Sequence, residues 1–311
     1  MGKANPFGSH STADKVLAGI DLSGKSVVVT GCTSGLGFET MNALTSNGAH
    51  VFGLARSLED AAAACRRAGP FTTPIACDLA DLESVAAAAD AIGRQTLLDA
   101  IVANAGIAHL PTPQVRYGVE RQFLVNHLGH FALIRALEQQ LRPGAGRVVI
   151  VSASAGVSHA PPEGIMFDNL DGRRSYDPMT FYSQSKFANA LHAKELSRRL
   201  APRGIMVNSL HPGAARGTRL HKNTRLAFRI ALSAAQPFMR SPAQGAATQA
   251  LLAASPLVEG ITGEYWFNCD IARAHPLVDD VQLAQRLWAF SEDLIERHSR
   301  RAADKVLSEA A

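Results

Sequence analysis

Tyr182 and Lys186 stand four residues apart in this chain of 311 residues, a pairing whose types and spacing can do proton chemistry. Residues four apart on a helix lie on one face, roughly one turn from each other. A free phenol has a pKa of about 10, and a neighbouring ammonium lowers it by favouring the phenolate. The tyrosine then becomes usable as a proton donor or acceptor. Such pairs also occur on solvated helices, so the meaning of this one depends on the elements around it.

Short apolar stretches alternate along the chain with longer helical ones. The apolar stretches are typical of fully buried strands and cover residues 26–30, 50–55, 73–77, 100–103, 148–151, 205–210 and 263–267. The stretches typical of helices cover residues 39–46, 58–68, 82–93, 121–141, 181–200 and 243–253. This alternation predicts an α/β, doubly wound fold, in which helices cover both faces of a seven-stranded and mostly parallel sheet.

Composition narrows the class of protein. The chain is 47% hydrophobic and 19% charged, with a formal net charge of +4 and no block of Lys and Arg. These values do not favour nucleic-acid binding. The four cysteines are scattered without the spacing of a metal site, which is typical of reduced cysteines. No signal-peptide pattern and no run of about 18 apolar residues is present. We therefore expect a cytoplasmic protein without a membrane span and without a metal.

A glycine-rich loop follows the first predicted strand and opens the next helix, in the order Thr30-Gly31-Cys32-Thr33-Ser34-Gly35-Leu36-Gly37. Gly31 permits the tight turn, Gly35 lets the backbone approach a pyrophosphate, and Gly37 lets the helix pack near the strand. The helix N-terminus, with Ser34 and Leu36, offers free N–H groups and a positive dipole end to phosphates. The loop predicts a dinucleotide site in a Rossmann-type domain.

The second predicted strand ends in Ala55-Arg56-Ser57, where sites for NAD usually carry a carboxylate. The guanidinium of Arg56 suits a ribose 2′-phosphate by charge and by its forked geometry, which favours NADP(H) over NAD(H). An exposed arginine at a helix entrance is the alternative. Asp78, followed by Leu79, ends the third strand and is placed to meet the adenine end of a cofactor. Alternatively Asp78 is simply an N-cap residue.

The chain divides into three predicted parts. We expect an N-terminal arm over residues 1–22, a single NAD(P)-binding catalytic domain over 23–280, and a C-terminal helical tail over 281–311. Two longer loops, at about 155–180 and 214–242, are predicted to border the substrate. The apolar residues of the segment 216–240 fit a helical lid, and they fit an ordinary amphipathic helix on the core equally well.

With these motifs in hand, the chain resembles the short-chain dehydrogenase/reductase family over about residues 24–295. The resembling segments occur in family order and are Thr30–Gly37, Asn104-Ala105-Gly106, Val125–Phe131, Tyr182–Lys186 and His211-Pro212-Gly213. Within the family, Val125–Phe131 and Gly263–Phe267 most resemble the retinol-dehydrogenase and WW-domain-oxidoreductase branch.

The resemblance implies a role for each matching residue. Tyr182 is the implied general acid in reduction and base in oxidation, and Lys186 lowers its pKa and holds the nicotinamide ribose. Asn126 keeps a kink in its helix and orders a water that links Lys186 to solvent. The remaining implied contacts are to the cofactor, from Asn104, Ala105 and Gly106 along its strand, from Pro212 and Gly213 beside the nicotinamide, and from Thr218 near its carboxamide or phosphates.

The chain departs from the family at the serine that orients the substrate. The family places it second in a Ser-Ser pair, and this chain has Ala153 there, between Ser152 and Ser154. Because side chains alternate along a strand, both serines should point away from the position that Ala153 faces. A bulge or an early end of the strand would turn Ser154 inward, which makes Ser154 the candidate catalytic serine.

The resulting hypothesis is an NADP(H)-dependent oxidoreductase that transfers hydride between nicotinamide and an alcohol or carbonyl, with a hydrophobic or bulky substrate. A redox sensor or scaffold that binds cofactor with weak turnover, and a reductase of C=C bonds, are the alternatives. The resemblance also implies a homodimer or homotetramer through helices 121–141 and 181–200. His127 and His130 are interpreted as helix-packing or surface histidines, and His211 as packing or bonding locally.

Overall fold

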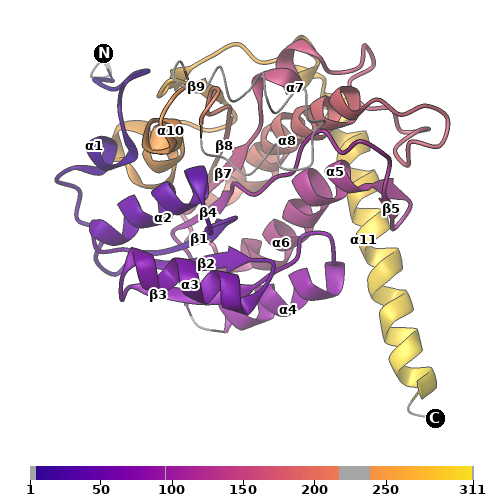
Figure 1. Cartoon of the computed structure of the whole chain (residues 1–311), viewed down its shortest axis with the longest axis horizontal. Coiled ribbons are helices and arrows are strands. Elements are labelled where there is room, and N and C mark those ends of the chain that lie inside the picture. The colour runs from indigo at the N-terminus through magenta and orange to yellow at the C-terminus, as the bar shows by residue number, and fades with distance from the viewer. Residues whose placement is uncertain (1–4, 95, 217–238, 310–311) are drawn as a thin grey trace.

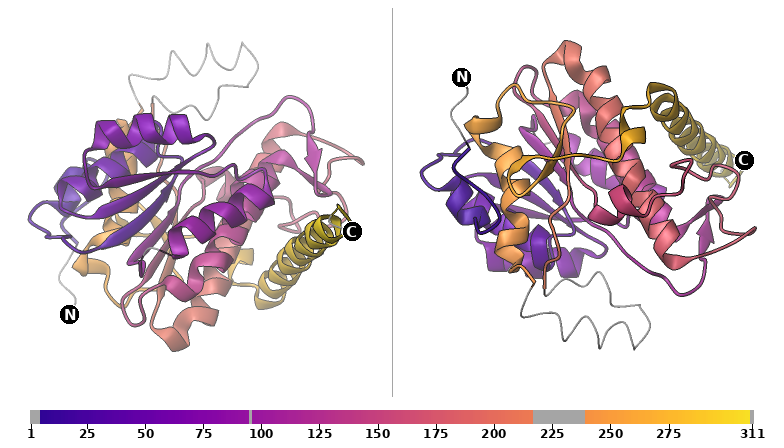
Figure 2. Two further views of the ribbon diagram at one scale, coloured as in Figure 1. Left: turned by 90° about the horizontal axis from the view of Figure 1, so that it is seen from below. Right: turned by 90° about the horizontal axis from the view of Figure 1, so that it is seen from above.

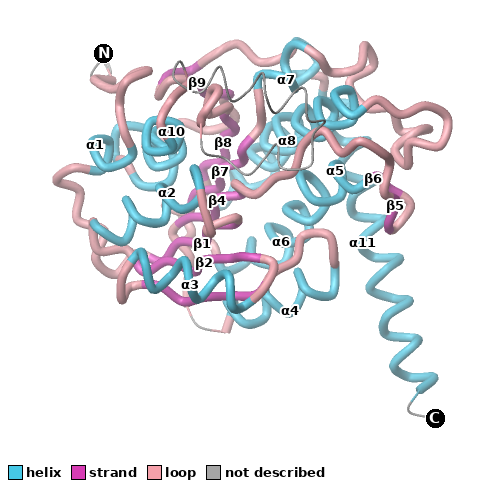
Figure 3. Tube along the Cα trace, viewed as in Figure 1, coloured by secondary structure: helices cyan, strands magenta, loops and turns pink. Residues whose placement is uncertain are grey.

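An eight-stranded sheet forms the centre of the computed structural model, which describes residues 5–94, 96–216 and 239–309, with side chains up to residue 300. The strand order is β10-β9-β8-β7-β4-β1-β2-β3 (Figures 1 and 3). The strands are β1 Ser26–Thr30, β2 His50–Ala55, β3 Thr72–Ala76, β4 Ala100–Ala103, β7 Arg147–Val151, β8 Met206–Leu210, β9 Tyr265–Phe267 and β10 Asp270–Ile271. A separate hairpin joins β5 Val115–Arg116 to β6 Val119–Glu120.

Helices cover both faces of this sheet (Figure 2). One layer contains α1 Ala13–Leu17, α2 Gly35–Ser46, α3 Leu58–Ala68 and α10 Pro242–Ala254. The other layer contains α4 Leu82–Gly93, α6 Gly129–Leu137, α8 Pro178–Leu200 and α11 Val281–Glu309. The short helices are α5 Arg121–Phe123, α7 Ser154–Ser158, the π-helical turn η1 Leu124–Leu128, and the 3₁₀ turns η2 Glu138–Gln140, η3 Ala201–Arg203, η5 Pro256–Val258 and η6 Pro276–Asp279.

Strand side chains alternate between the two helical layers. In β1, Val27 and Val29 pack into the core with α2 and α10, whereas Val28 packs into the core with α4, α6 and α8. Val28 also lies in register with Phe52 of β2 and Ile101 of β4, which share its core. Because both faces are buried, the strands read as unbroken apolar stretches rather than alternating ones.

The predicted α/β, doubly wound class is confirmed, and all seven predicted strands are present in a sheet whose strands are parallel except at one edge. The eighth strand, β10, is not predicted. It pairs antiparallel with β9 through a turn in which Asn268 and Cys269 both adopt positive φ, 56° and 62°. Without the usual turn glycine, this short hairpin has no clear sequence signal.

The helix predicted over 121–141 is not continuous. It consists of α5, the π turn η1, α6 and the 3₁₀ turn η2, with Asn126 at the centre of the π turn. The N–H of Gly129 bonds to the carbonyl of Leu124, five residues earlier. A π turn inserts one extra residue into a helix and often occurs at a functional site.

The helix α11 packs against α8 and α6 at its beginning, and its far half runs past the body of the domain (Figure 1). Trp288 contacts Phe131 of α6 with ring centroids 4.9 Å apart, and Arg199 of α8 lies 4.0 Å from the centre of its ring system. Arg135 of α6 forms an ion pair with Glu292 at 2.8 Å. The helices 121–141 and 181–200, which were predicted to contact a second copy of the chain, are therefore partly covered by α11. The oligomeric state stays a prediction.

Part of the predicted substrate border lies outside the described residues, namely most of the segment 216–240, including Thr218. Among the helices that the structure describes, none is long and apolar enough to cross a membrane.

Three histidines lie inside the core between η1, α6 and α8. His127, His130 and His192 are 0%, 1% and 3% exposed, so the surface alternative for His127 and His130 is wrong and the packing alternative holds. Burial lowers the pKa of His127 to about 3 and that of His130 to about 4, and it lowers the pKa of His192 well below its ordinary value. All three are therefore neutral in the folded protein at pH 7.

We predict that these histidines make the fold acid-sensitive. Below about pH 6.5 the unfolded chain binds protons that the folded core does not, so stability falls as pH falls from 6.5 towards 4. Each histidine removes up to about 1.4 kcal/mol per pH unit. Glu120 has the opposite effect on stability. Burial raises its pKa to about 7, so on acidification the folded protein binds one proton there before the unfolded chain does. Urea unfolding at pH 7, 6 and 5 measures the slope. His192→Phe should reduce it by about one proton, and an unchanged slope would contradict the prediction.

Candidate active site

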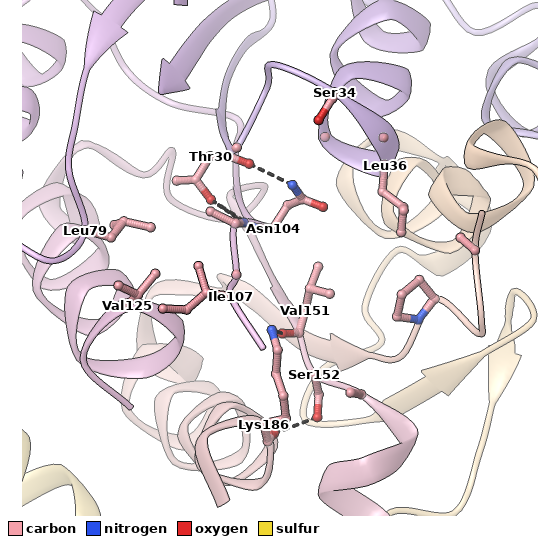
Figure 4. A pocket seen from close by; sticks show the side chains of 18 of the residues that line it. Thr30, Ser34, Leu36, Leu79, Asn104, Ile107, Val125, Val151, Ser152 and Lys186 are labelled. Atoms are coloured by element: carbon pink, nitrogen blue, oxygen red, sulfur yellow. Dashed lines mark hydrogen bonds between the residues drawn. The ribbon is translucent and has the colours of Figure 1, made fainter. Parts of the chain in front are cut away.

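A cavity of about 500 Å³ opens at the carboxyl ends of the parallel strands. This size is typical of a small-molecule or cofactor site. Figure 4 shows residues from the ends of β1, β4 and β7 and from α8 around it. Of the predicted site residues, those that line it are Gly31, Ser34, Gly35, Leu36, Gly37, Arg56, Asp78, Leu79, Asn104, Ala105, Gly106, Ser154, Tyr182, Lys186, Pro212 and Gly213. The fold thus brings together segments that are far apart in the sequence.

The glycine loop makes one wall of the cavity. Gly31 has φ +70°, a conformation that favours glycine. A Cβ placed on Gly37 would lie 2.3 Å from the carbonyl oxygen of Gly31 and 2.5 Å from Nδ2 of Asn104, so the start of α2 can approach β1 only with glycine there. The N-terminus of α2 consequently faces the cavity with N–H groups that can bind an anion.

Thr30 joins this loop to the end of β4, a role that the sequence analysis missed. Its hydroxyl oxygen accepts hydrogen bonds from the backbone N–H of Asn104 at 2.9 Å and of Ala105 at 3.0 Å. Its carbonyl accepts from Nδ2 of Asn104 at 2.8 Å (Figure 4). The position of Thr30 at the first place of the glycine motif is the signal that would have indicated it. These bonds fix two strand ends side by side at the cavity.

The end of the cavity beyond β2 and β3 carries charged groups. The side chain of Arg56 is exposed there, and Asp60 lines the same region. Asp78 accepts a hydrogen bond from the N–H of Ala80 at 2.9 Å. The N-cap of α4 is Asp81, whose side chain accepts from the N–H of Glu83, so the alternative that Asp78 caps this helix is wrong.

Tyr182 and Lys186 lie on the buried face of α8, 6% and 3% exposed. Nζ of Lys186 donates to the carbonyl of Val151 at 2.9 Å (Figure 4). Burial lowers the pKa of Lys186 to about 7 and raises the pKa of Tyr182 above its ordinary value. Desolvation disfavours the charged form of both groups, and for Tyr182 it outweighs the lowering expected from the lysine.

Asn126 does not line the cavity but lies directly behind it. Its Oδ1 accepts from the N–H of Ile107 at 2.8 Å, and its Nδ2 donates to the carbonyl of Ile107 and to Oγ of Ser185, both at 2.9 Å. A Cβ placed on Gly106 would lie 3.2 Å from Oδ1 of Asn126 and 3.3 Å from Nζ of Lys186. Asn126 thus connects the segment after β4 to the helix that carries the Tyr-Lys pair.

The two serines after β7 have different surroundings. Ser152 lines the cavity but is 2% exposed, and its hydroxyl already donates to the carbonyl of Lys186 at 2.6 Å. Strand β7 ends at Val151, and Ser154 begins α7 with an exposed side chain at the cavity. Because the strand ends before Ser154, the alternation of side-chain directions along β7 does not extend to it.

His211 follows β8 and lines the cavity together with Pro212 and Gly213. Its ring stacks on Phe267 with centroids 3.9 Å apart, and its Nδ1 accepts from the N–H of Gly213 at 3.3 Å. The prediction that His211 packs and bonds locally is confirmed. Gly213 has φ +76°, and Nε of Arg240 would lie 3.1 Å from a Cβ placed there.

Comparison with known proteins agrees with this geometry. A family model described as short chain dehydrogenase matches residues 25–165. The human WW domain-containing oxidoreductase is 36% identical, over 93% of this chain and 72% of its own length. Retinol dehydrogenase 14 of Mus musculus is 36% identical, over 88% of this chain and 86% of its own.

A solved structure of an uncharacterized protein from Mycobacterium paratuberculosis superposes with a TM-score of 0.71 at 32% identity, covering 89% of this chain and 95% of that one. The match in fold and in sequence extends over most of the chain. The chain therefore belongs to the short-chain dehydrogenase/reductase family and is an NAD(P)-dependent oxidoreductase.

Proposed function

We propose that the protein transfers hydride between NADP(H) and an alcohol or carbonyl substrate, with Tyr182 as the general acid or base. The observation that carries the proposal is the shared cavity. It brings Tyr182 and Lys186 of α8 to the same space as the glycine loop before α2. A nicotinamide cofactor supplies the hydride chemistry when bound, while the protein supplies position and electrostatics.

The residues of the cavity fit such a cofactor. The close approach of Gly37 to Gly31 leaves backbone N–H groups open to a pyrophosphate at the start of α2. Asp78 and Leu79 suit the adenine end, and Asn104, Ala105 and Gly106 suit the middle of the site. Pro212 and Gly213 would border the nicotinamide, and Thr218 is proposed for its carboxamide or the phosphates.

The protonation states support the role of Tyr182. Its raised pKa keeps the phenol protonated at pH 7, as a proton donor to a carbonyl oxygen requires. Lys186, with a pKa of about 7, exchanges protons in the same pH range and suits a group that resupplies the tyrosine. We propose that Asn126 orders a water between Lys186 and solvent.

The decisive variant is Tyr182→Phe, which keeps the ring and removes the acidic proton. We expect it to lower kcat for NADPH-dependent carbonyl reduction by about 10²- to 10⁴-fold, because the general acid is lost. NADPH affinity, measured by fluorescence titration, should stay within about threefold. Tyr117→Phe is the matched control, since the Tyr117 hydroxyl donates to Oδ1 of Asp81 and neither residue lines the cavity. Full activity in Tyr182→Phe would refute the proposed role.

Ser154 is proposed to hold the substrate oxygen in place of the family serine. All three residues 152–154 line the cavity, but the Ser152 hydroxyl is buried and donates to the carbonyl of Lys186, and Ala153 has no hydroxyl. The side chain of Ser154 is exposed. This serine would donate to the same oxygen that Tyr182 protonates.

We predict that Ser154→Ala lowers kcat by about 10²-fold, the effect of losing one donor to a reacting oxygen. Adding Ala153→Ser to that variant should restore most of the activity, because a serine then stands at the family position. Steady-state rates of the single and double variants measure both effects. A Ser154→Ala enzyme with wild-type kcat would show that another group orients the substrate.

The preference for NADP(H) over NAD(H) rests on Arg56. Arg56 stands directly after β2, where sites for NAD usually carry a carboxylate. Asp60 lines the same region of the cavity. Arg56→Asp should lower the preference for NADPH by about 10- to 100-fold, because a charged hydrogen bond is lost. The ratio of kcat/KM for NADPH and NADH measures it. Arg66→Asp, on the exposed surface of α3, is the control, and equal effects of the two changes would contradict the assignment.

A hydrophobic or bulky substrate remains the proposed class. Leu110 and Met239 line the cavity with apolar side chains, and Ala153 leaves more room than a serine would. A cytoplasmic location is likewise proposed and rests on the sequence alone.

A further inference from the structure

A buried imidazole connects the cofactor strands to the π turn, and nothing in the proposed chemistry uses it. His130 is 1% exposed and belongs to α6, directly after η1. Its Nδ1 lies 2.9 Å from the carbonyl oxygen of Asn126, and its Nε2 lies 2.9 Å from the hydroxyl oxygen of Thr30. The ring therefore spans from the end of β1 to the centre of the π turn.

The hydrogen-bond partners of both ring nitrogens place the proton of His130 on Nδ1. The Asn126 carbonyl can only accept, so Nδ1 of His130 carries the proton and donates. The Thr30 hydroxyl oxygen already accepts two backbone N–H groups, from Asn104 and Ala105, so its own proton must go to an acceptor. Nε2 of His130 at 2.9 Å is closer than the Val102 carbonyl at 3.5 Å. The ring is thus neutral, which agrees with its pKa of about 4.

His130 bonds to the carbonyl of Asn126, and the side chain of Asn126 bonds in turn to α8. Asn126 is bonded through its amide to Ile107 and to Ser185, the residue before Lys186. With His130 on its carbonyl, Asn126 is fixed from both its backbone and its side chain. The chain of bonds then runs from Thr30 through His130 and Asn126 to α8.

We propose that His130 is a positioning residue of the active site, which holds Asn126 in the π turn by a bond from Nδ1 to its carbonyl and fastens that turn to Thr30 through Nε2. The inference rests on the proposed function. Through Asn126, His130 sets the place of Lys186 relative to the cofactor strands.

The neighbouring histidines show that burial alone does not create such a link. His192 is also buried, and neither of its ring nitrogens has a hydrogen-bond partner among the described residues. His127 bonds through Nε2 to Oγ of Ser291 in α11, away from the cavity. His192→Phe is therefore a control for the loss of a buried imidazole from the same core.

Nitrogen NMR of histidine-labelled protein tests the geometry without any turnover. We expect His130 to be neutral from pH 7 down to about 5.5, with its proton on Nδ1. A proton on Nε2, or a charged ring at pH 6, would overturn the proposal. This measurement keeps its meaning if the enzyme shows no activity, in which case the proposed function fails and the positioning of Asn126 is judged separately.

Kinetics then test the consequence. His130→Phe keeps a flat aromatic ring of somewhat larger size but removes both bonds, and it should lower kcat by about 10- to 100-fold through misplacement of the reacting groups. NADPH affinity should change less than about threefold, because Thr30 keeps its bonds to Asn104 and Ala105. His192→Phe should lower stability without a comparable loss of kcat. Equal losses of kcat in both variants would overturn the proposal.

Two conservative variants separate the ends of the bridge and serve if His130→Phe does not fold. His130→Asn places an amide N–H near the Nδ1 position and keeps the bond to Asn126, whereas His130→Gln places an acceptor near Nε2 and keeps the bond to Thr30. We expect the Asn variant to be the more active, with a pH profile of kcat closer to that of the wild type. The reverse order, or equal activity, would overturn the proposal.

Discussion

The hydroxyl of Thr30 is the contact on which the cavity depends. It sits where β1 ends, and it receives the N–H groups of Asn104 and Ala105 from the neighbouring strand β4. Two accepted bonds leave one proton, which goes to His130 and so to the π turn. One buried side chain thus sets the spacing of the glycine loop, the end of β4 and α6. Valine in its place would remove an acceptor from the N–H groups of Asn104 and Ala105.

Burial is the main influence on the pKa values of Tyr182 and Lys186. Phenol and ammonium each lose favourable hydration on α8, so both are held as neutral groups more strongly than in water. This is the opposite of the starting expectation for Tyr182, in which the ammonium of Lys186 was the dominant influence. The helix tolerates these polar groups because 17 of its residues are buried against the sheet, η1 and α11, and their packing fixes its position.

Much of the fold could be predicted from the sequence, because its signals are local. Strands buried on both faces read as apolar runs, and the glycine loop marks the start of α2 through positions such as Gly37 that exclude a Cβ. What could not be predicted depends on contacts between distant segments. The resemblance implied a kink at Asn126, where the π turn lies, but the bridge of His130 to Thr30 joins residues 100 positions apart. Likewise, α11 covers parts of α6 and α8, and the sequences of those two helices do not indicate this contact.

The central claim is that the cavity at the carboxyl ends of the strands holds the cofactor against Tyr182. A crystal structure of the protein with NADPH tests it most directly. We expect the pyrophosphate at the N-terminus of α2, the 2′-phosphate against Arg56, and the nicotinamide beside Gly213 with the Tyr182 hydroxyl facing its reactive carbon. NADPH bound outside this cavity, or bound with its nicotinamide turned away from Tyr182, would contradict the claim.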